Sequence, residues 1–155
     1  MCDLRVPKHR TPADVLLPGG ETHHLALFLA EAAPDHDGPE RPLDLLNGGI
    51  DFIPALDVRS GRMTFLNRAA LSAVRVAREV EPDDSPTIPT EHEVEVLLGD
   101  GTRLTGFVSY LRPAEHARLV DFLNEPPPFF RLLEPGSVTL VNKRHVARVA
   151  LLAAP

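Results

Sequence analysis

The pattern Asp-x-Leu-Asn occurs twice in this chain, at residues 44–47 and again, 77 positions later, at residues 121–124. Two further matches flank this pair and keep the same order: residues 15–20 match 96–101 at an offset of 81, and residues 63–68 match 138–143 at an offset of 75. Self-similarity of this kind indicates that one structural unit has been copied. We therefore expect two similar small modules that pack together.

The falling offset shows where the two copies differ in length. The first copy has four more residues between positions 32 and 42, and two more between positions 57 and 61. Extra residues are tolerated best in surface loops, because the entropy of closing a loop grows slowly with its length. The insertions therefore mark loops, and the matched stretches mark the regular elements.

The copies divide the chain of 155 residues into four parts. Residues 1–13 are polar and contain two prolines, which predicts a flexible lead-in. The first module spans residues 14–78 and the second spans residues 93–155. Residues 79–92 contain three prolines among acidic residues, a composition typical of a linker. Because a unit of about 60 residues buries only about 60% of its unfolded surface, each module is expected to depend on the other.

Within each module, the apolar alternation and the Gly and Pro turns predict the element order β-β-α-β-β-β. The expected strands are 14–17, 25–30, 52–56, 63–66 and 71–76 in the first module and 94–98, 104–110, 129–133, 138–141 and 146–151 in the second, with helices at 42–47 and 113–124. The predicted fold class is therefore mainly β (α+β), with two small β-barrel-like modules of about five strands and one short helix each. Asn47 and Asn124 end the helices, where left-handed backbone geometry is expected.

Part of the second module resembles the Sm-like small barrels. The resemblance to their first motif lies in an apolar alternation, an Asp-Gly turn and a glycine in the next strand: Val96, Leu98, Asp100, Gly101, Leu104, Gly106 and Val108. The turn at residues 142–146 is similar to the second Sm-like motif, without its usual glycine. The Sm-like helix precedes the first strand, whereas the helix expected here follows the second. Over almost all of each module, the chain more closely resembles an uncharacterised bacterial domain family, which implies a barrel-like module and no particular activity.

The chain carries no pattern that predicts catalysis, a metal or a cofactor. His23 and His24 are adjacent, but neighbours on a strand point to opposite faces, and no Cys or carboxylate cluster stands at metal-ligand spacing. No Ser or Thr stands in a known nucleophile motif, and no glycine run can cradle a phosphate. Asp44 and Asp121 recur in both copies, which favours a structural role in the helix. We therefore expect a non-enzymatic protein without a cofactor.

RNA binding is one alternative, because Sm-like modules often bind RNA. The candidate contacts are Lys143, Arg144 and His145, which form a local basic turn. The formal charge of −6 argues against this function, since Lys and Arg supply most non-specific affinity for phosphates. Residues 95–155 are near neutral, with seven Lys and Arg against six acids. Aromatic residues for base stacking are few, with one Tyr and no Trp.

The leading interpretation is an adaptor or regulatory module that acts by protein contact. Its candidate docking segment consists of Pro127, Pro128, Phe129 and Phe130, although the same residues suit a strand that enters the core equally well. Edge strands of open barrels can also pair with a protein partner or with a second copy of the chain. A third possibility is a small-ligand sensor with a pocket between the modules.

The sequence also bears on location. Its longest apolar runs, such as residues 25–30, are far shorter than the roughly 20 residues of a membrane helix. The N-terminus lacks the apolar core of a signal peptide, and the single cysteine, Cys2, has no partner for an internal disulfide. We expect a cytoplasmic protein that does not bind membranes.

Overall fold

The computed structural model describes residues 8–33, 36, 38–82, 90–110 and 118–152. These residues form a mainly β structure with ten strands, two short α-helices and single 3-10 turns. In chain order the elements are β1 (Lys8–Leu16), β2 (Thr22–Ala30), α1 (Pro42–Leu46), β3 (Phe52–Asp57), β4 (Arg62–Asn67), η1 (Arg68–Ala70), β5 (Ala73–Ala77), η2 (Arg78–Val80), β6 (Thr90–Leu98), β7 (Arg103–Tyr110), α2 (Leu119–Leu123), β8 (Phe129–Glu134), β9 (Ser137–Asn142), η4 (Lys143–His145) and β10 (Val146–Leu151). Each half, β1–β5 and β6–β10, therefore follows the order of strands and helix expected from the sequence.

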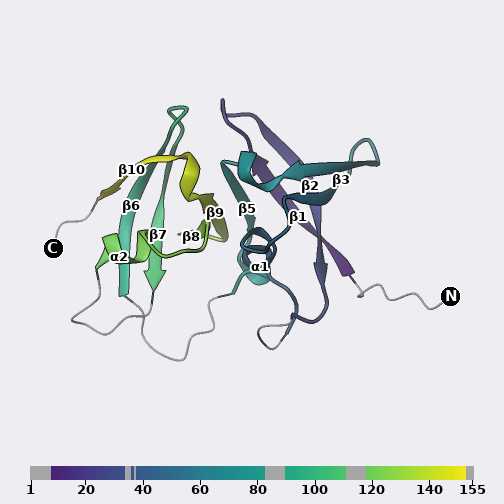
Figure 1. Ribbon diagram of the computed structural model, residues 1–155, viewed down its shortest axis with the longest axis horizontal. Coiled ribbons are helices and arrows are strands. Elements are labelled where there is room, and N and C mark those ends of the chain that lie inside the picture. Colours follow the sequence, from purple (N-terminus) through teal and green to yellow (C-terminus); the bar gives the residue numbers. More distant parts are fainter. Residues whose placement is uncertain (1–7, 34–35, 37, 83–89, 111–117, 153–155) are drawn as a thin grey trace.

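The ten strands form one antiparallel sheet with the order β10-β6-β7-β8-β9-β5-β1-β2-β3-β4. Figure 1 shows β9 and β5 side by side in the middle, with β10 and β6 on one side and β2 and β3 on the other. The sheet is not closed, so the expected barrels are not confirmed. Closing the first half would require β4 to pair with β5, but β5 already pairs with β1 on one side and with β9 on the other.

Equivalent strands pair in the same register in the two halves, once residue numbers are shifted by the sequence offsets. The equivalent pairs are Val15–His23 and Val96–Leu104 in the first hairpins, Ile53–Leu66 and Phe130–Val141 in the second hairpins, and Val15–Val74 and Val96–Val149 between the first and last strands. A slip of one residue would turn every side chain to the other face of its strand. Positions that match in sequence therefore occupy equivalent places in the two halves.

The buried apolar side chains form two clusters that exchange residues across the middle of the sheet. The first cluster consists mainly of residues from β1–β5 and α1, but it also contains Phe129, Val138 and Leu140 from the second half. The second cluster consists of residues from β6–β9, with Ala73 from the first half. Neither half therefore completes its apolar core alone.

Two boundaries differ from the sequence prediction. Residues 8–13, assigned to the lead-in, form the first part of β1, because their backbone pairs with β2 as far as Ala30. The predicted linker is regular at both ends, in η2 and at the start of β6. The rest of the linker, at 83–89, and the first part of the predicted second helix lie outside the described residues.

The predicted left-handed geometry at the helix ends is wrong. Asn47 has a φ of −92° and Asn124 a φ of −93°, and no described residue other than glycine has a positive φ. Each helix is only five residues long. The chain leaves it through the bridge region of backbone space, which asparagine adopts without entering the left-handed region.

Gly106 allows β8 to lie close against β7. A Cβ atom at this position would lie 2.5 Å from the carbonyl oxygen of Leu133 and 2.9 Å from Cγ of Leu132. Both distances are shorter than a van der Waals contact, and the first involves backbone that cannot turn aside. The glycine in the return strand is therefore needed for packing.

We predict that Gly106→Ala lowers the free energy of unfolding by about 2–3 kcal/mol, the upper range for overpacking a core. Gly99→Ala is the matched control, because a Cβ there would meet its nearest atom, the carbonyl oxygen of His145, at an ordinary 3.7 Å. Urea denaturation measures both variants. Equal stability of the two variants would contradict the prediction.

Candidate protein-interaction surface

The two halves are joined by antiparallel pairing of β5 with β9. Five residues of each strand face each other, from the pair Ala73–Val141 to the pair Ala77–Ser137. Every residue of β9 from Val138 to Asn142 is buried by this contact and by the clusters on either side. We call this contact the junction.

Polar groups fix the position of β9 against β5. Asn142 donates from Nδ2 to the carbonyl oxygen of Leu71 at 2.9 Å, and its Oδ1 accepts from the N–H of Arg144 at 3.0 Å. Arg75 on β5 donates from Nε to Oγ1 of Thr139 on β9 at 3.2 Å. Because these bonds are directional, they select one register as well as adding stability.

Asn47 at the end of α1 forms a second link between the halves. Its Oδ1 accepts from the N–H of Phe129 at 2.8 Å, and its Nδ2 donates to the carbonyl oxygen of the same residue at 3.2 Å. The side chain of Phe129 is buried in the first cluster. One amide therefore pairs with both backbone groups of a residue that the other half provides. The equivalent Asn124 bonds within its own helix, to the carbonyl oxygen of Val120.

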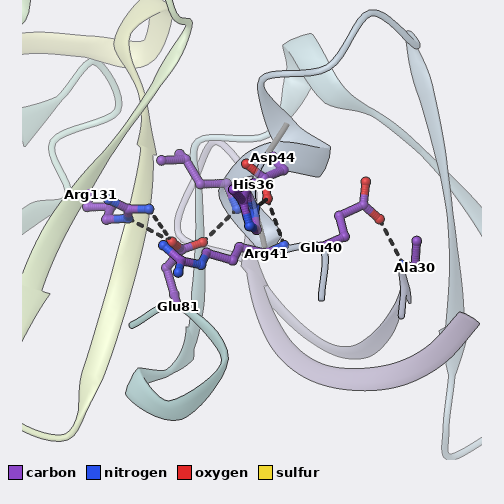
Figure 2. Close-up of polar contacts among 8 residues, drawn as sticks. Ala30, His36, Glu40, Arg41, Asp44, Glu81 and Arg131 are labelled. Carbon is purple, nitrogen blue, oxygen red and sulfur yellow. Dashed lines mark hydrogen bonds and ion pairs between the residues drawn. The ribbon is translucent and has the colours of Figure 1, made fainter. Parts of the chain in front are cut away.

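Glu81 forms the third link. Its side chain is fully buried, and one carboxylate oxygen accepts from Nε and NH2 of Arg131 on β8 at 2.7 and 2.6 Å. The other oxygen accepts from the N–H of Leu43 in α1 at 2.8 Å. Figure 2 shows this carboxylate with Arg131 on one side and the first turn of α1 on the other. Loss of Arg131, whose side chain is 32% exposed, would leave the fully buried carboxylate without its charged partner and so destabilise the fold.

Asp44 has a structural role at the start of α1, and the equivalent Asp121 lies 4.0 Å from Nε of Arg118. Its Oδ2 accepts from the N–H of Arg41 at 2.9 Å, which satisfies a backbone donor at the start of α1. His36 Nε2 lies 2.6 Å from the same oxygen (Figure 2). This carboxylate therefore links His36 to the first turn of α1.

The first hairpin turns of the two halves also touch. Asp100 accepts from the N–H of Thr102 at 2.9 Å and from the N–H of Gly19, in the other half, at 2.6 Å. Hydrogen bonds lower the pKa of Asp100 below its ordinary 3.8. The largest effect comes from the backbone N–H of Thr102, and smaller ones come from the Thr102 side chain and from the N–H of Gly19. The folded chain is therefore more stable when Asp100 is charged than when it is neutral.

The basic turn is involved in contacts within the chain. Lys143 donates from Nζ to the carbonyl oxygen of Glu125 at 2.7 Å, and burial lowers the pKa of Lys143. His145 Nε2 lies 2.9 Å from the carbonyl oxygen of Ala69 in the first half. Of the three candidate nucleic-acid contacts, only Arg144 is exposed. The structure therefore places the three residues side by side in η4, where Lys143 and His145 also bond within the chain.

The candidate docking segment is largely inside the molecule. Phe129 and Phe130 are buried, one in each cluster, because they form the start of β8. Only Pro127 is exposed, and Pro128 is half-buried. The interpretation of these residues as a strand that enters the core matches the structure, and the two aromatic rings are not accessible to a partner.

A hollow lies between the halves, as the ligand-sensor alternative requires. It is lined by Leu43 and Asn47 of the first half and by residues of the second half that include Phe122 and Phe129. Its volume is about 140 Å³. Two larger, open hollows also lie between the halves, one of about 420 Å³ beside Pro18 and His145 and one of about 520 Å³ beside Glu81 and Glu91, and both have the roughly 300–1,000 Å³ usual for small-molecule pockets.

Exposed apolar side chains gather at the two ends of the sheet, where the sequence analysis placed no specific site. Among the described residues, the large ones are Ile50, Phe52, Val58, Met63, Phe65, Phe107, Val120, Leu151 and Leu152. Five of them lie in or beside β3 and β4: Ile50, Phe52, Val58, Met63 and Phe65. Three lie at the other end, with Val120 in α2, Leu151 in β10 and Leu152 directly after it. Apolar side chains concentrated on open sheet edges are typical of interaction sites.

The structure also bears on metal binding and on membrane spans. In the part of the chain that the structure describes, no three His, Cys, Asp or Glu side chains are grouped so that they could hold a metal ion. Each described helix is too short or too polar to cross a membrane. His23 and His24 each lie near a single carboxylate, Glu21 and Asp14 respectively.

Comparison with protein-family models, with curated proteins and with solved structures finds no match to this chain.

We predict that Asn47→Ala destabilises the chain by about 2 kcal/mol, because it leaves both backbone groups of the buried Phe129 without their partner. Asn124→Ala removes the equivalent amide, which makes one exposed bond to its own helix, and should cost only about 0.5–1 kcal/mol. Urea denaturation of both variants measures the difference. A larger loss for Asn124→Ala would contradict the role given to Asn47.

We predict a pH-dependent effect of Asp100→Asn. Because the folded chain lowers this pKa, the charged carboxylate stabilises the fold fully at pH values above 3.8 and progressively less as the pH falls through the folded pKa. The variant should therefore unfold at a lower urea concentration than the wild type at neutral pH, and the difference should shrink below about pH 4. A difference that stays constant down to about pH 3 would contradict this account.

Proposed function

We propose that this chain is a non-enzymatic protein-interaction module, built from a duplicated small β unit, and that it binds its partner through the open edges of its sheet. The observation that carries the proposal is the row of exposed apolar side chains Phe52, Met63 and Phe65 on β3 and β4. Exposed aromatic residues on an unpaired strand supply both backbone hydrogen-bonding groups and apolar area to a partner strand.

The chemistry of the edge supports this function. β4 contains neither a proline nor a lysine, two of the residue types that protect edges from pairing. Phe65 is 66% exposed, although Phe is among the residues most often buried. An exposed aromatic residue at an edge costs solubility, and contact with a protein partner offsets that cost.

The two alternatives have weaker support. RNA binding by the basic turn would require Lys143 and His145 to leave their contacts with Glu125 and Ala69. A ligand sensor would use one of the two larger hollows between the halves, of about 420 and 520 Å³, and among the described residues neither of these is lined by a Phe or Tyr side chain of the kind that predominates in small-molecule pockets. The proposal also places the protein in the cytoplasm, in line with the sequence expectation.

The test is capture of tagged chain, with cross-linking, from extracts of the cells that produce it. Phe65→Lys should reduce recovery of at least one bound protein about tenfold, because buried aromatic anchors dominate interface energies. Phe107→Lys is the matched control: it makes the same change at an exposed Phe on β7, which is an interior strand of the sheet. Circular dichroism verifies that both variants are folded. If both variants recover the same proteins as the wild type, the edge is not an interaction site.

A further inference from the structure

We propose that the partner of the β4 edge is a second copy of this chain, whose β10 pairs with β4 in the arrangement by which β5 pairs with β9 inside the chain. The inference rests on the proposed function and identifies the partner and the register of the contact.

The strand order provides the first argument. The junction joins β5, the last strand of the first half, to β9, the fourth strand of the second half. The two edges of the sheet are β10, the last strand of the second half, and β4, the fourth strand of the first half. The two edge strands, β10 and β4, are therefore the equivalents of β5 and β9, the two strands that pair at the centre of the sheet.

The internal register predicts the register between chains. Both β5 and β9 are related to their equivalents, β10 and β4, by the offset of 75. Shifting the pairs of the junction by this offset gives the pairs between copies: Arg148–Leu66, Val149–Phe65, Ala150–Thr64, Leu151–Met63 and Leu152–Arg62. Both arginines face leucines, so no like charges oppose each other, and the apolar pairs are compatible with strand pairing.

Burial provides the second argument. Phe129, Val138 and Leu140 are the residues of the second half that are buried in the first cluster, and they are 2%, 0% and 0% exposed. Their equivalents in the first half are Phe52, Met63 and Phe65, which are 58%, 49% and 66% exposed. The same three positions are therefore core at the junction and surface at the edge.

The opposite edge provides the matching surface. Val76 on β5 is 2% exposed at the junction, whereas its equivalent on β10, Leu151, is 57% exposed. Leu43 of α1 lines the hollow between the halves, and its equivalent, Val120 of α2, is 47% exposed. A second copy placed on this edge would cover both side chains with its own Phe52, Met63 and Phe65.

One polar group of the junction, Asn142, has its counterpart Asn67 at the β4 edge, whereas Arg75 corresponds to Ala150 and Arg131 to Pro54. Asn67 accepts from the N–H of Ala69 as Asn142 accepts from that of Arg144. Asn142 further donates to the carbonyl oxygen of Leu71 across the junction. In the described part of the chain, Asn67 Nδ2 makes no equivalent bond. In the proposed assembly, it donates to the carbonyl oxygen of Val146 in the second copy, the equivalent of Leu71.

The α2 end follows the same pattern. Asn47 binds both backbone groups of Phe129 at the junction, and the equivalent contact between copies joins Asn124 to Phe52. Because the two surfaces are different, each copy uses one edge in the contact, and the pair still has one free β4 edge and one free β10 edge. Such a contact is heterologous, and it continues from copy to copy until a ring closes or a filament forms.

The decisive experiment uses two variants that each disable one edge. Phe65→Lys disables β4, and Leu151→Lys disables β10. Both side chains are exposed in the single chain, so neither change disturbs a core. Analytical ultracentrifugation follows the wild type, each variant alone, an equimolar mixture of the two, and Phe107→Lys as the folded control.

The expected result is an association of the wild type and of Phe107→Lys that grows with protein concentration, and a loss of association in each edge variant alone. The mixture should form one-to-one dimers, because each variant keeps the edge that the other lacks. A wild type that is monomeric at every concentration would overturn the proposal, as would an edge variant that still associates alone. The cell-extract experiment then decides separately whether the edge binds another protein.

Discussion

The pairing of β5 with β9 is the contact on which the rest of the structure depends. It turns two five-stranded halves into one sheet, and it allows each half to supply apolar side chains to the other's core. Asn47, Glu81 and Asn142 add directional bonds on either side of the pairing. Because a half of this size buries too little apolar surface alone, its stability comes from the shared interface.

The same pairing explains why the sheet remains open. A strand in a sheet has two sides, and β5 uses one for β1 and the other for β9. Neither half can then close on itself. Positions whose side chains are covered by a neighbouring strand at the centre of the sheet are uncovered at the equivalent places on β4 and β10. The apolar edges are thus a consequence of building one sheet from two copies of the same unit, and association between chains is the arrangement that covers them.

Much of the fold can be predicted from the sequence, because strands and hairpins are local features. The alternation around Val96 and the Asp-Gly turn at Asp100 indicate a hairpin without knowledge of the rest of the chain. The partner of β5 is a long-range contact, and no local pattern specifies it. For the same reason Phe129 and Phe52 look alike in the sequence, although one is core and the other surface. The sequence therefore suggests a docking segment that includes Phe129 and Phe130, but their exposure depends on which half supplies the neighbouring strand, and both side chains are buried.

Hydrogen exchange at two protein concentrations tests the central claim most directly, because it reads the backbone amides of the edges in the unmodified chain. If the edges pair as the junction does, exchange in residues 62–67 and 146–151 slows as the concentration rises, while exchange in the interior strand β7 stays unchanged. Exchange in both edge segments that is equally fast at every concentration would contradict it.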